Sequence, residues 1–331
     1  MKDREIKTTV ILPVYNGLPY LKSSIQSVLT QSLSDFEFII INDGSKDSSE
    51  IDIKQFSDLR IRYFTQTNCS LATTLNRAIA LSNSDYIARI DQDDIMMPTR
   101  LDKQLKYMKQ HPEVAMVGTW SKIIKDNHPT LRNHTHAISD KAIKLELLFD
   151  NPFVHSSIMI RKSVLDMVGG YCEDKSRQPP EDYELWSRIS RNYKLSNIPE
   201  YLMEYREVDT SMSRTGVNPF LENVTKISSE NLYYWLKDSY SLQECLQLSC
   251  LYHGFRSQQK SPSALSKRKA IKMYLLAVDK ISENIKENNT EFNIIVDKQL
   301  KQIKSRFLYS YIPSFLKPLL KSLRNKVLGK G

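Results

Sequence analysis

The chain has 331 residues, 40% of them hydrophobic and 26% charged, which is an ordinary globular composition that can bury a core in one large domain or in two. The formal net charge is +9, and nine cations lie from residue 298 onward, where no acid occurs. The remainder of the chain is therefore formally neutral. This excludes a protein whose body binds polyanions by charge, and it leaves a one-signed field only at the tail.

Cysteine usage and hydropathy indicate a compartment. The four cysteines form no C-x-x-C pair and no metal-ligand spacing, which favours a reducing environment. The first residues are charged and run directly into Thr8-Thr9-Val10, without the pattern of a secretory leader. No stretch approaches the ~20 apolar residues of a membrane-spanning helix. We therefore expect a cytoplasmic protein that is not inserted in a membrane.

Short apolar runs alternate with helical patterns through the first hundred residues. The runs predicted to be strands are 10–14, 36–41, 60–64 and 86–90, and helical spacing of Leu and Ile follows each of the first three. Alternation of this kind predicts an α/β fold with a mostly parallel central sheet and flanking helices. Such sheets bind ligands at the carboxyl ends of their strands.

Three carboxylates follow the strand predicted at 86–90. Asp91, Asp93 and Asp94 lie within four residues, and like charges so close repel one another unless a cation or hydrogen-bond donors stand between them. Oxygen-only ligands suit Mg²⁺ or Mn²⁺, which proteins usually hold with one or two carboxylates and substrate phosphates. The alternative is a surface acidic turn before a helix that Pro98 could open.

Two other strand ends carry polar groups to the same edge. Tyr15 offers an aromatic surface and Asp43 a carboxylate, which together suit a pyrimidine base beside a metal-bound pyrophosphate. Neither G-x-G-x-x-G nor G-x-x-x-x-G-K-[ST] is present, so a glycine-rich phosphate loop is not expected. These residues predict a site for a nucleoside diphosphate.

Several segments resemble the motifs of family 2 glycosyltransferases, the inverting GT-A enzymes that build bacterial surface polysaccharides. Order and spacing agree over roughly residues 8 to 215. The matching segments are Val10-Ile-Leu-Pro-Val-Tyr-Asn16, Ile41-Asn-Asp-Gly-Ser-Lys-Asp47, Leu75-Asn-Arg77, Ala88-Arg-Ile-Asp-Gln-Asp-Asp94 with Pro98 and Arg100-Leu101, Val168-Gly-Gly-Tyr171 and Glu181-Asp-Tyr-Glu-Leu-Trp186.

The resemblance implies a Rossmann-like GT-A domain at residues 1–218 and a role for each matching acid. Asp93 would be the main ligand of Mn²⁺ or Mg²⁺ with Asp94 in support, and Asp182 would be the general base with Glu181 beside it. The residues implied in nucleotide binding are Pro13 and Tyr15 at the base, Asp43 at the uracil or its equivalent, and Asp91 near the ribose.

The implied reaction is an inverting transfer of a hexose or N-acetylhexosamine. The donor would be a nucleoside-diphosphate sugar, with a UDP-sugar favoured, and the acceptor a saccharide or a lipid-linked saccharide. In a single in-line displacement Asp182 would take the acceptor proton while the alcohol attacks the anomeric carbon.

Helical spacing supports the placement of the acid pair independently of the resemblance. Asp182, Leu185, Trp186 and Ile189 follow i, i+3, i+4, i+7, so a helix beginning near residue 180 would keep its acids at the N-terminal rim. The alternative is that the acids only complement the helix dipole. That dipole would also keep Asp182 ionised, and therefore a weak base.

Some positions depart from the family pattern or stay ambiguous. After Tyr205-Arg206, Val208 occupies the usual histidine position and Asp209 follows, so the third metal ligand is left open. Residues 127–136 read as a polar, histidine-containing loop. His155 fits a buried core position and an acceptor site equally well.

The region 219–331 reads as helices, predicted at 221–236, 242–255, 264–285 and 292–308. After them, Leu316, Leu320 and Leu323 share one helical face while Lys317, Lys321 and Arg324 share the other. This pattern is typical of a basic amphipathic helix, either in peripheral contact with anionic lipid at the inner face of the membrane or packed on the body.

Three other classes of function stay open at this point. A metal-dependent nucleotidyltransferase would also use paired acids, although no basic glycine-rich loop follows the first strand. A non-catalytic nucleotide-sugar binder would share the donor site. Nucleic-acid binding would rest on the basic tail alone, without any recognised reading motif, and is not expected.

Overall fold

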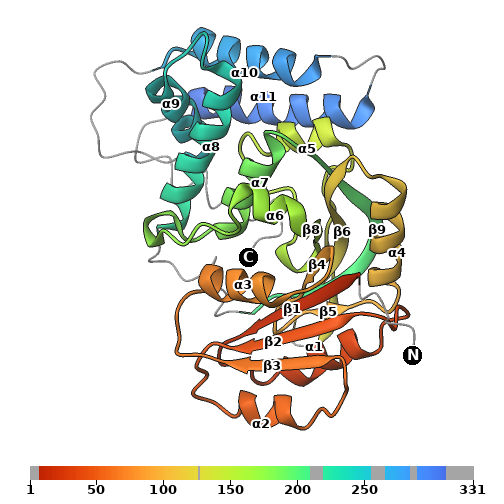
Figure 1. Cartoon of the computed structure of the whole chain (residues 1–331). Helices are drawn as coiled ribbons and strands as arrows, with labels where there is room; N and C mark the ends of the chain where they lie inside the picture. Colours follow the sequence, from red (N-terminus) through yellow and green to blue (C-terminus); the bar gives the residue numbers. More distant parts are fainter. Residues whose placement is uncertain (1–6, 126, 209–218, 255–264, 284–288, 311–331) are drawn as a thin grey trace. The chain divides into compact units, whose positions relative to one another are not determined.

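The computed structural model describes residues 7–125, 127–208, 219–254, 265–283 and 289–310, and the chain divides into two compact units, 1–227 and 228–331 (Figure 1). The predicted domain boundary at 218/219 falls shortly before this division. That residues 1–218 form the catalytic domain stays a prediction.

The first unit is built on a nine-stranded sheet whose first half is parallel. Its order there is β3-β2-β1-β4, and all three pairings are parallel. The strands are β1 Thr8–Val14, β2 Glu37–Asn42, β3 Ile61–Thr65 and β4 Tyr86–Arg89. The connecting helices are α1 Leu21–Leu29, α2 Ser49–Lys54 and α3 Leu71–Leu81. Strand β2 is buried along its whole length, as continuous apolar strands covered on both faces require.

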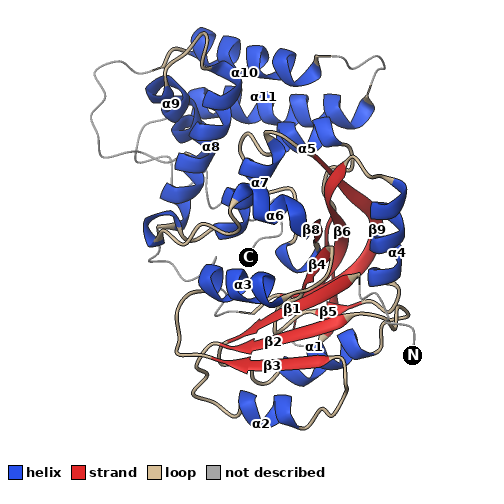
Figure 2. Cartoon of the chain, viewed as in Figure 1, coloured by secondary structure: helices blue, strands red, loops and turns tan. Residues whose placement is uncertain are grey.

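The second half of the sheet is mixed. Strand β8 (Met159–Arg161) runs antiparallel to β4 and to β6 (Val114–Lys125), while β9 (Lys194–Arg206) pairs parallel to β6 and antiparallel to β5 (Ile95–Met96). Its helices are α4 Arg100–Gln110, α5 Asp140–Glu146, α6 Lys162–Val168 and α7 Glu181–Ser190, with 3₁₀ turns η1 His155–Ser157 and η2 Lys175–Arg177. Figure 2 shows the strands curling as one sheet with α4 beside β9.

These observations confirm the α/β fold and the helical C-terminal region, with one refinement and one correction. The sheet is parallel only from β3 to β4 and between β6 and β9. The prediction of a loop at residues 127–136 was wrong, because residues 128–134 form strand β7, which pairs antiparallel with β6. The polar composition of β7 reflects its exposure, since a strand at a sheet edge needs no apolar face.

The second unit consists of helices. Helix α8 (Phe220–Leu236) crosses the division between units, and α9 Leu242–His253, α10 Lys267–Ser282 and α11 Thr290–Ser310 follow. Ser241 and Glu244 form a capping box at the start of α9, and the Tyr274 hydroxyl of α10 donates to the Val296 carbonyl of α11 at 3.2 Å. Among the residues described, none of the helices has the length and apolar character needed to cross a bilayer. The predicted amphipathic tail lies outside those residues.

Candidate active site

The acidic loop after β4 is anchored by the start of β8. Because β8 runs antiparallel to β4, the η1 turn that precedes it lies at the carboxyl end of β4. The Asp91 N–H donates to Ser156 Oγ at 3.1 Å, and the Ser156 hydroxyl donates to Asp91 Oδ2 at 2.7 Å. The predicted acids therefore lie where parallel strands end, as ligand sites of such sheets do.

A buried arginine lies beneath the acids. Arg89 is 1% exposed, and its guanidinium makes two contacts with the Asp91 carboxylate, Nη1 to Oδ2 at 3.1 Å and Nη2 to Oδ1 at 2.5 Å. The charge of Arg89 also acts on Glu181 and Asp182. One cation therefore serves both acidic groups that the sequence predicts, and a two-point contact of this kind fixes the Asp91 carboxylate in orientation.

The other two acids of the loop differ sharply in exposure. Asp94 is 1% exposed; its Oδ1 accepts from the Arg206 N–H at 2.8 Å, and its Oδ2 is buried without a hydrogen-bond partner among the described residues. Asp93 is partly exposed, and its carbonyl accepts from Arg206 Nε at 2.8 Å. Burial and then the charge of Asp91 raise the pKa of Asp93 to about 6. Of these two acids, Asp93 is therefore the one that a ligand can reach, and the Asp91 side chain is also 31% exposed.

This donor set fits a divalent cation that shares its coordination with a substrate. The side-chain oxygens of the loop are carboxylates only, and burial and then the charges of the neighbouring acids raise the pKa of Asp93 and Asp94. In the described part of the chain, His, Cys, Asp and Glu side chains nowhere gather in threes as a ready-made metal cage. A site of one or two carboxylates completed by phosphates is the arrangement that Mg²⁺ usually accepts. Asp209 lies outside the described residues.

A glutamine that the sequence did not predict holds the side of the site that was predicted to bind a nucleotide. Gln92 makes two hydrogen bonds with the backbone of Tyr15: its Oε1 accepts from the N–H at 2.8 Å and its Nε2 donates to the carbonyl at 3.1 Å. Tyr15 is 42% exposed, whereas Pro13 is partly buried in β1. The backbone of Tyr15 is thus held beside the acidic loop, and its ring stays exposed.

Asp43, another residue predicted to bind the nucleotide, lies at the end of β2. It is 5% exposed, and its carboxylate accepts hydrogen bonds from Gln66 Nε2 at 2.6 Å, the Cys69 N–H at 3.0 Å and Asn68 Nδ2 at 3.2 Å. Gly44, with φ of +74°, makes the turn beside it, and a Cβ there would lie 2.8 Å from the Asn68 nitrogen. Asp43 therefore orders the 66–69 loop, a role that its position in the sequence did not reveal.

The predicted acid pair begins helix α7 as expected. Asp182 accepts from Asn151 Nδ2 and from the Tyr183 N–H, both at 2.7 Å. The expectation that the helix dipole leaves Asp182 a weak, low-pKa base was wrong, because burial outweighs it and raises the pKa of Asp182. Burial and then the charge of Asp182 raise the pKa of Glu181 to about 7.

A chain of contacts that the sequence analysis missed supports the acid pair. His155 Nε2 lies 2.8 Å from the Tyr171 hydroxyl. The backbone of Tyr171 is held by Asn76, whose Oδ1 accepts from its N–H at 2.8 Å and whose Nδ2 donates to its carbonyl at 2.9 Å. Gly170, with φ of +65°, permits this approach, since a Cβ would lie 2.6 Å from Asn76 Oδ1. The Leu75-Asn-Arg77 and Gly-Gly-Tyr171 motifs thus meet in space.

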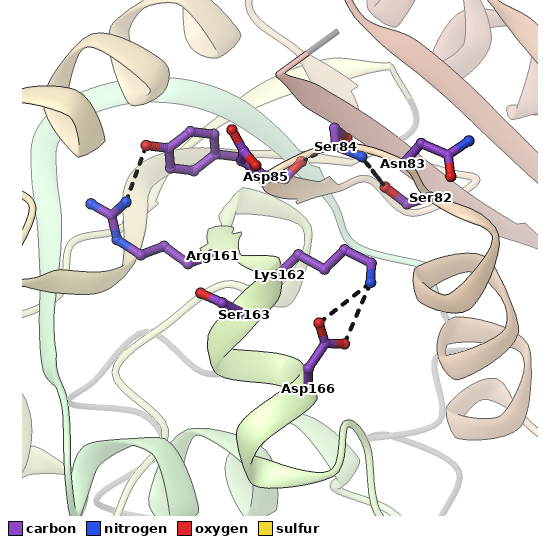
Figure 3. A pocket seen from close by; sticks show the side chains of 9 residues that line it. Ser82, Asn83, Ser84, Asp85, Arg161, Lys162, Ser163 and Asp166 are labelled. Carbon is purple, nitrogen blue, oxygen red and sulfur yellow. Dashed lines mark hydrogen bonds and ion pairs between the residues drawn. The ribbon is translucent and has the colours of Figure 1, made fainter. Parts of the chain in front are cut away.

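A second hollow lies at the other end of β4. Its cavity volume is about 600 Å³, and it is lined by residues 82–86 and by Arg161, Lys162, Ser163 and Asp166 (Figure 3). Figure 3 shows Lys162 directed at Asp166, and the two charged groups are 3.4 Å apart. Arg161 Nη1 donates to the Tyr86 hydroxyl at 3.1 Å. The hollow lies at the amino end of the strand that carries the acidic loop at its carboxyl end.

Comparison with known proteins assigns the family. The model of "Glycosyl transferase family 2" matches residues 9–169. The O-antigen biosynthesis glycosyltransferase WbnJ of Escherichia coli is 34% identical over 259 residues, which cover 74% of this chain and 94% of WbnJ. The chain belongs to glycosyltransferase family 2. This membership favours glycosyl transfer over the nucleotidyltransferase and non-catalytic alternatives.

Solved structures agree with the family 2 fold. Staphylococcus aureus TarS 1-349 in complex with UDP-GlcNAc aligns with a TM-score of 0.58 at 15% identity, covering 91% of this chain and 90% of that one. The mannosyltransferase PcManGT from Pyrobaculum calidifontis, in complex with GDP-Man and Mn²⁺, aligns with a TM-score of 0.51 at 13% identity, covering 92% and 88%. At these identities the likeness shows the shared fold alone.

Proposed function

We propose that this family 2 enzyme transfers a hexose or N-acetylhexosamine from a nucleoside-diphosphate sugar with inversion, and that Asp182 is the general base. The observation that carries the proposal is the setting of Asp182. Its side chain is only 16% exposed and is held by two donors at the rim of α7, and the charge of Arg89 links it to the Asp91 loop. Burial raises the pKa of Asp182, which makes it a stronger base than a free aspartate.

The donor half of the site supports a nucleoside diphosphate, with uridine favoured. The exposed Tyr15 ring offers a stacking surface on a backbone that Gln92 holds in place, and Asp43 supplies a carboxylate for the base or the loop around it. Asp91, fixed by Arg89 and Ser156, is proposed to contact the ribose. TarS binds UDP-GlcNAc and PcManGT binds GDP-Man, so relatives in fold take both kinds of base.

Asp93 is the residue proposed to hold Mn²⁺ or Mg²⁺, with Asp94 in support from behind. A divalent ion bound there would neutralise charge on the departing diphosphate. The chain's own contribution is to keep the loop in place, through the two hydrogen bonds that Arg206 donates to Asp93 and Asp94. PcManGT was solved with Mn²⁺, which supports this choice of ion.

In the proposed step Asp182 accepts the proton of the acceptor hydroxyl as its oxygen attacks the anomeric carbon. The C–O bond to the diphosphate breaks on the opposite face, so the configuration inverts. The acceptor is proposed to be a saccharide or a lipid-linked saccharide in the synthesis of a surface polysaccharide, as the name of WbnJ indicates for that relative. Peripheral contact of the C-terminal tail with anionic lipid on the cytoplasmic side would bring the enzyme to a lipid-linked acceptor.

The test separates donor binding from turnover. Asp182→Asn should leave the dissociation constant of the donor, measured by calorimetry with Mn²⁺ across a panel of UDP- and GDP-sugars, within a few-fold of wild type. Release of the nucleoside diphosphate should fall by about 10²–10⁴-fold, since general-base catalysis contributes that much.

Asp166→Asn is the matched control, because Asp166 is exposed and lies by the second hollow, away from the acid pair. It should retain both binding and turnover. Loss of donor binding in Asp182→Asn along with turnover, or unimpaired turnover, would contradict the assignment of the base.

A further inference from the structure

His155 lies between a tyrosine hydroxyl and the acid pair. Its Nε2 is 2.8 Å from the Tyr171 hydroxyl, while its Nδ1 is 3.8 Å from Asp182 Oδ2 and 4.0 Å from Glu181 Oε1. The Trp186 ring packs edge-on against the imidazole, with centroids 5.7 Å apart and planes at 87°. The ring is therefore enclosed, and each of its nitrogens faces a different partner.

The protonation states of the histidine and the tyrosine follow from burial. Burial, and then the charge of Arg89, lowers the pKa of His155 well below its ordinary value, so the imidazole is neutral and carries one N–H. Burial raises the pKa of the Tyr171 hydroxyl, so the phenol keeps its proton. The single imidazole proton must then lie on either the tyrosine side or the acid side of the ring.

We propose that Tyr171 donates its proton to Nε2 of His155 and fixes the tautomer whose Nδ1–H points at Asp182 and Glu181, which makes His155 a positioning residue for the general base. The inference rests on the role proposed for Asp182. In the opposite tautomer an imidazole lone pair would face the Asp182 carboxylate, and that of Glu181 whenever it is ionised, which is electrostatically unfavourable in a buried site.

The N–H directed at the acids has a definite consequence for the reaction. A donor facing a carboxylate favours its charged form, so it opposes the effect of burial and keeps Asp182 able to accept a proton at neutral pH. At 3.8 Å the contact is electrostatic, and catalytic hydrogen bonds commonly tighten in the complex with substrate. The titratable or charged groups that act on this cluster come from two elements and two loops. They are Arg89 of β4, Asp91 of the loop after β4, Glu181 and Asp182 of α7, and Tyr171 of the segment after α6.

The tautomer can be read directly by NMR. A long-range ¹H–¹⁵N spectrum of the full chain labelled with [¹⁵N]histidine, with the His155 signals identified by their absence in His155→Asn, distinguishes Nδ1–H from Nε2–H. Wild type should show Nδ1–H at His155. Tyr171→Phe should show a mixture, because the hydroxyl that occupies Nε2 is gone. Observation of Nε2–H in the wild type would overturn the proposal.

The pH dependence of kcat/KM gives a second readout that lost packing alone would not move. Tyr171→Phe and His155→Ala should shift the acid limb upward by about 0.5–1 pH unit, since removal of the donor raises the pKa of the base. His155→Asn places an amide N–H where Nδ1 was and should restore the limb to within a few tenths of a unit. Equal shifts for His155→Asn and His155→Ala would overturn the proposal.

Tyr183→Phe is the matched control for the hydroxyl deletion. Tyr183 is 1% exposed, and its hydroxyl donates to the Leu147 carbonyl at 2.9 Å, so its loss removes a buried hydrogen bond from α7 without touching His155. It should lower thermal stability and leave the acid limb unchanged. The NMR result does not depend on turnover: if Asp182→Asn stays active the proposed base is wrong, whereas an inactive Asp182→Asn together with Nε2–H at His155 refutes this inference alone.

Discussion

Gly170 makes the contact between α3 and the Tyr171 segment depend on one missing methyl group. A Cβ at Gly170 would lie 2.6 Å from Asn76 Oδ1, and the residue has φ of +65°. An alanine in this backbone region costs about 1–2 kcal/mol. Displacing Asn76 from the Tyr171 backbone would also forfeit two hydrogen bonds, each worth about 0.5–1.5 kcal/mol. Gly170→Ala should therefore lower the free energy of unfolding by about 2–5 kcal/mol, the sum of these contributions.

The neighbouring glycine provides a control for the backbone contribution alone. Gly169 has φ of +83°, and a Cβ there would meet no atom within 4 Å. Gly169→Ala should therefore cost only about 1–2 kcal/mol. Urea denaturation followed by tryptophan fluorescence would compare the two, because the buried Trp186 ring lies 6.3 Å from that of Tyr171.

A double-mutant cycle then identifies the clash. In an Asn76→Ala background the amide is absent, so Gly170→Ala should cost no more than Gly169→Ala does. The reasoning is refuted if the two glycine substitutions cost the same in the wild-type background. It is also refuted if the excess cost at Gly170 persists after Asn76 is removed.

Three further predictions follow from the acids and their partners. Arg89→Met should lower the free energy of unfolding by about 3–5 kcal/mol in chemical denaturation, because the Asp91 carboxylate loses its buried partner; an unchanged midpoint would contradict the pairing. The pKa of Glu181 is about 7 in the folded protein against an ordinary 4.5, so ionisation of Glu181 destabilises the fold as pH rises from 4.5 through 7. Glu181→Gln should therefore be more stable than wild type at pH 8 but not at pH 4.5. If the melting temperatures of the two proteins depend on pH in the same way, this reasoning is wrong. Donor affinity should depend on Mn²⁺ in the wild type and no longer depend on it in Asp93→Asn, because Asp93 is the proposed metal ligand. Calorimetry with Mn²⁺ and with EDTA measures this. A Mn²⁺ effect that persists in Asp93→Asn would show that another residue binds the metal.

The sequence predicted those parts of the fold that depend on local pattern. Uninterrupted apolar runs such as residues 38–41 of β2 identify buried parallel strands, since strands covered on both faces are apolar on both. The start of α7 at Glu181 was predicted because helical spacing and the preceding prolines agree. Strand β7 was missed because an exposed edge strand carries no apolar alternation to detect.

The candidate site was predictable in its acids but not in what holds them. Asp91, Asp93 and Asp94 are adjacent in sequence, so their clustering needs no fold. The partners of the acids come from distant segments, as with Ser156 at Asp91 and Arg206 at Asp94. The prediction that the helix dipole keeps the pKa of Asp182 low failed for the same reason. Burial raises that pKa, and burial depends on tertiary packing that helical spacing does not contain.

The antiparallel orientation of β8 makes the positions of residues 155–161 depend on one another. The three residues of β8 pair with Tyr86, Ile87 and Ala88 in a fixed register, and the turn just before β8 places His155 and Ser156 beside the acids. Since neighbouring residues of a strand face opposite sides of the sheet, deleting a single residue here would swap every side chain to the wrong face. Such a deletion would remove His155 from the acid pair and Ser156 from Asp91 together, so we expect the chain to tolerate length changes least at this stretch.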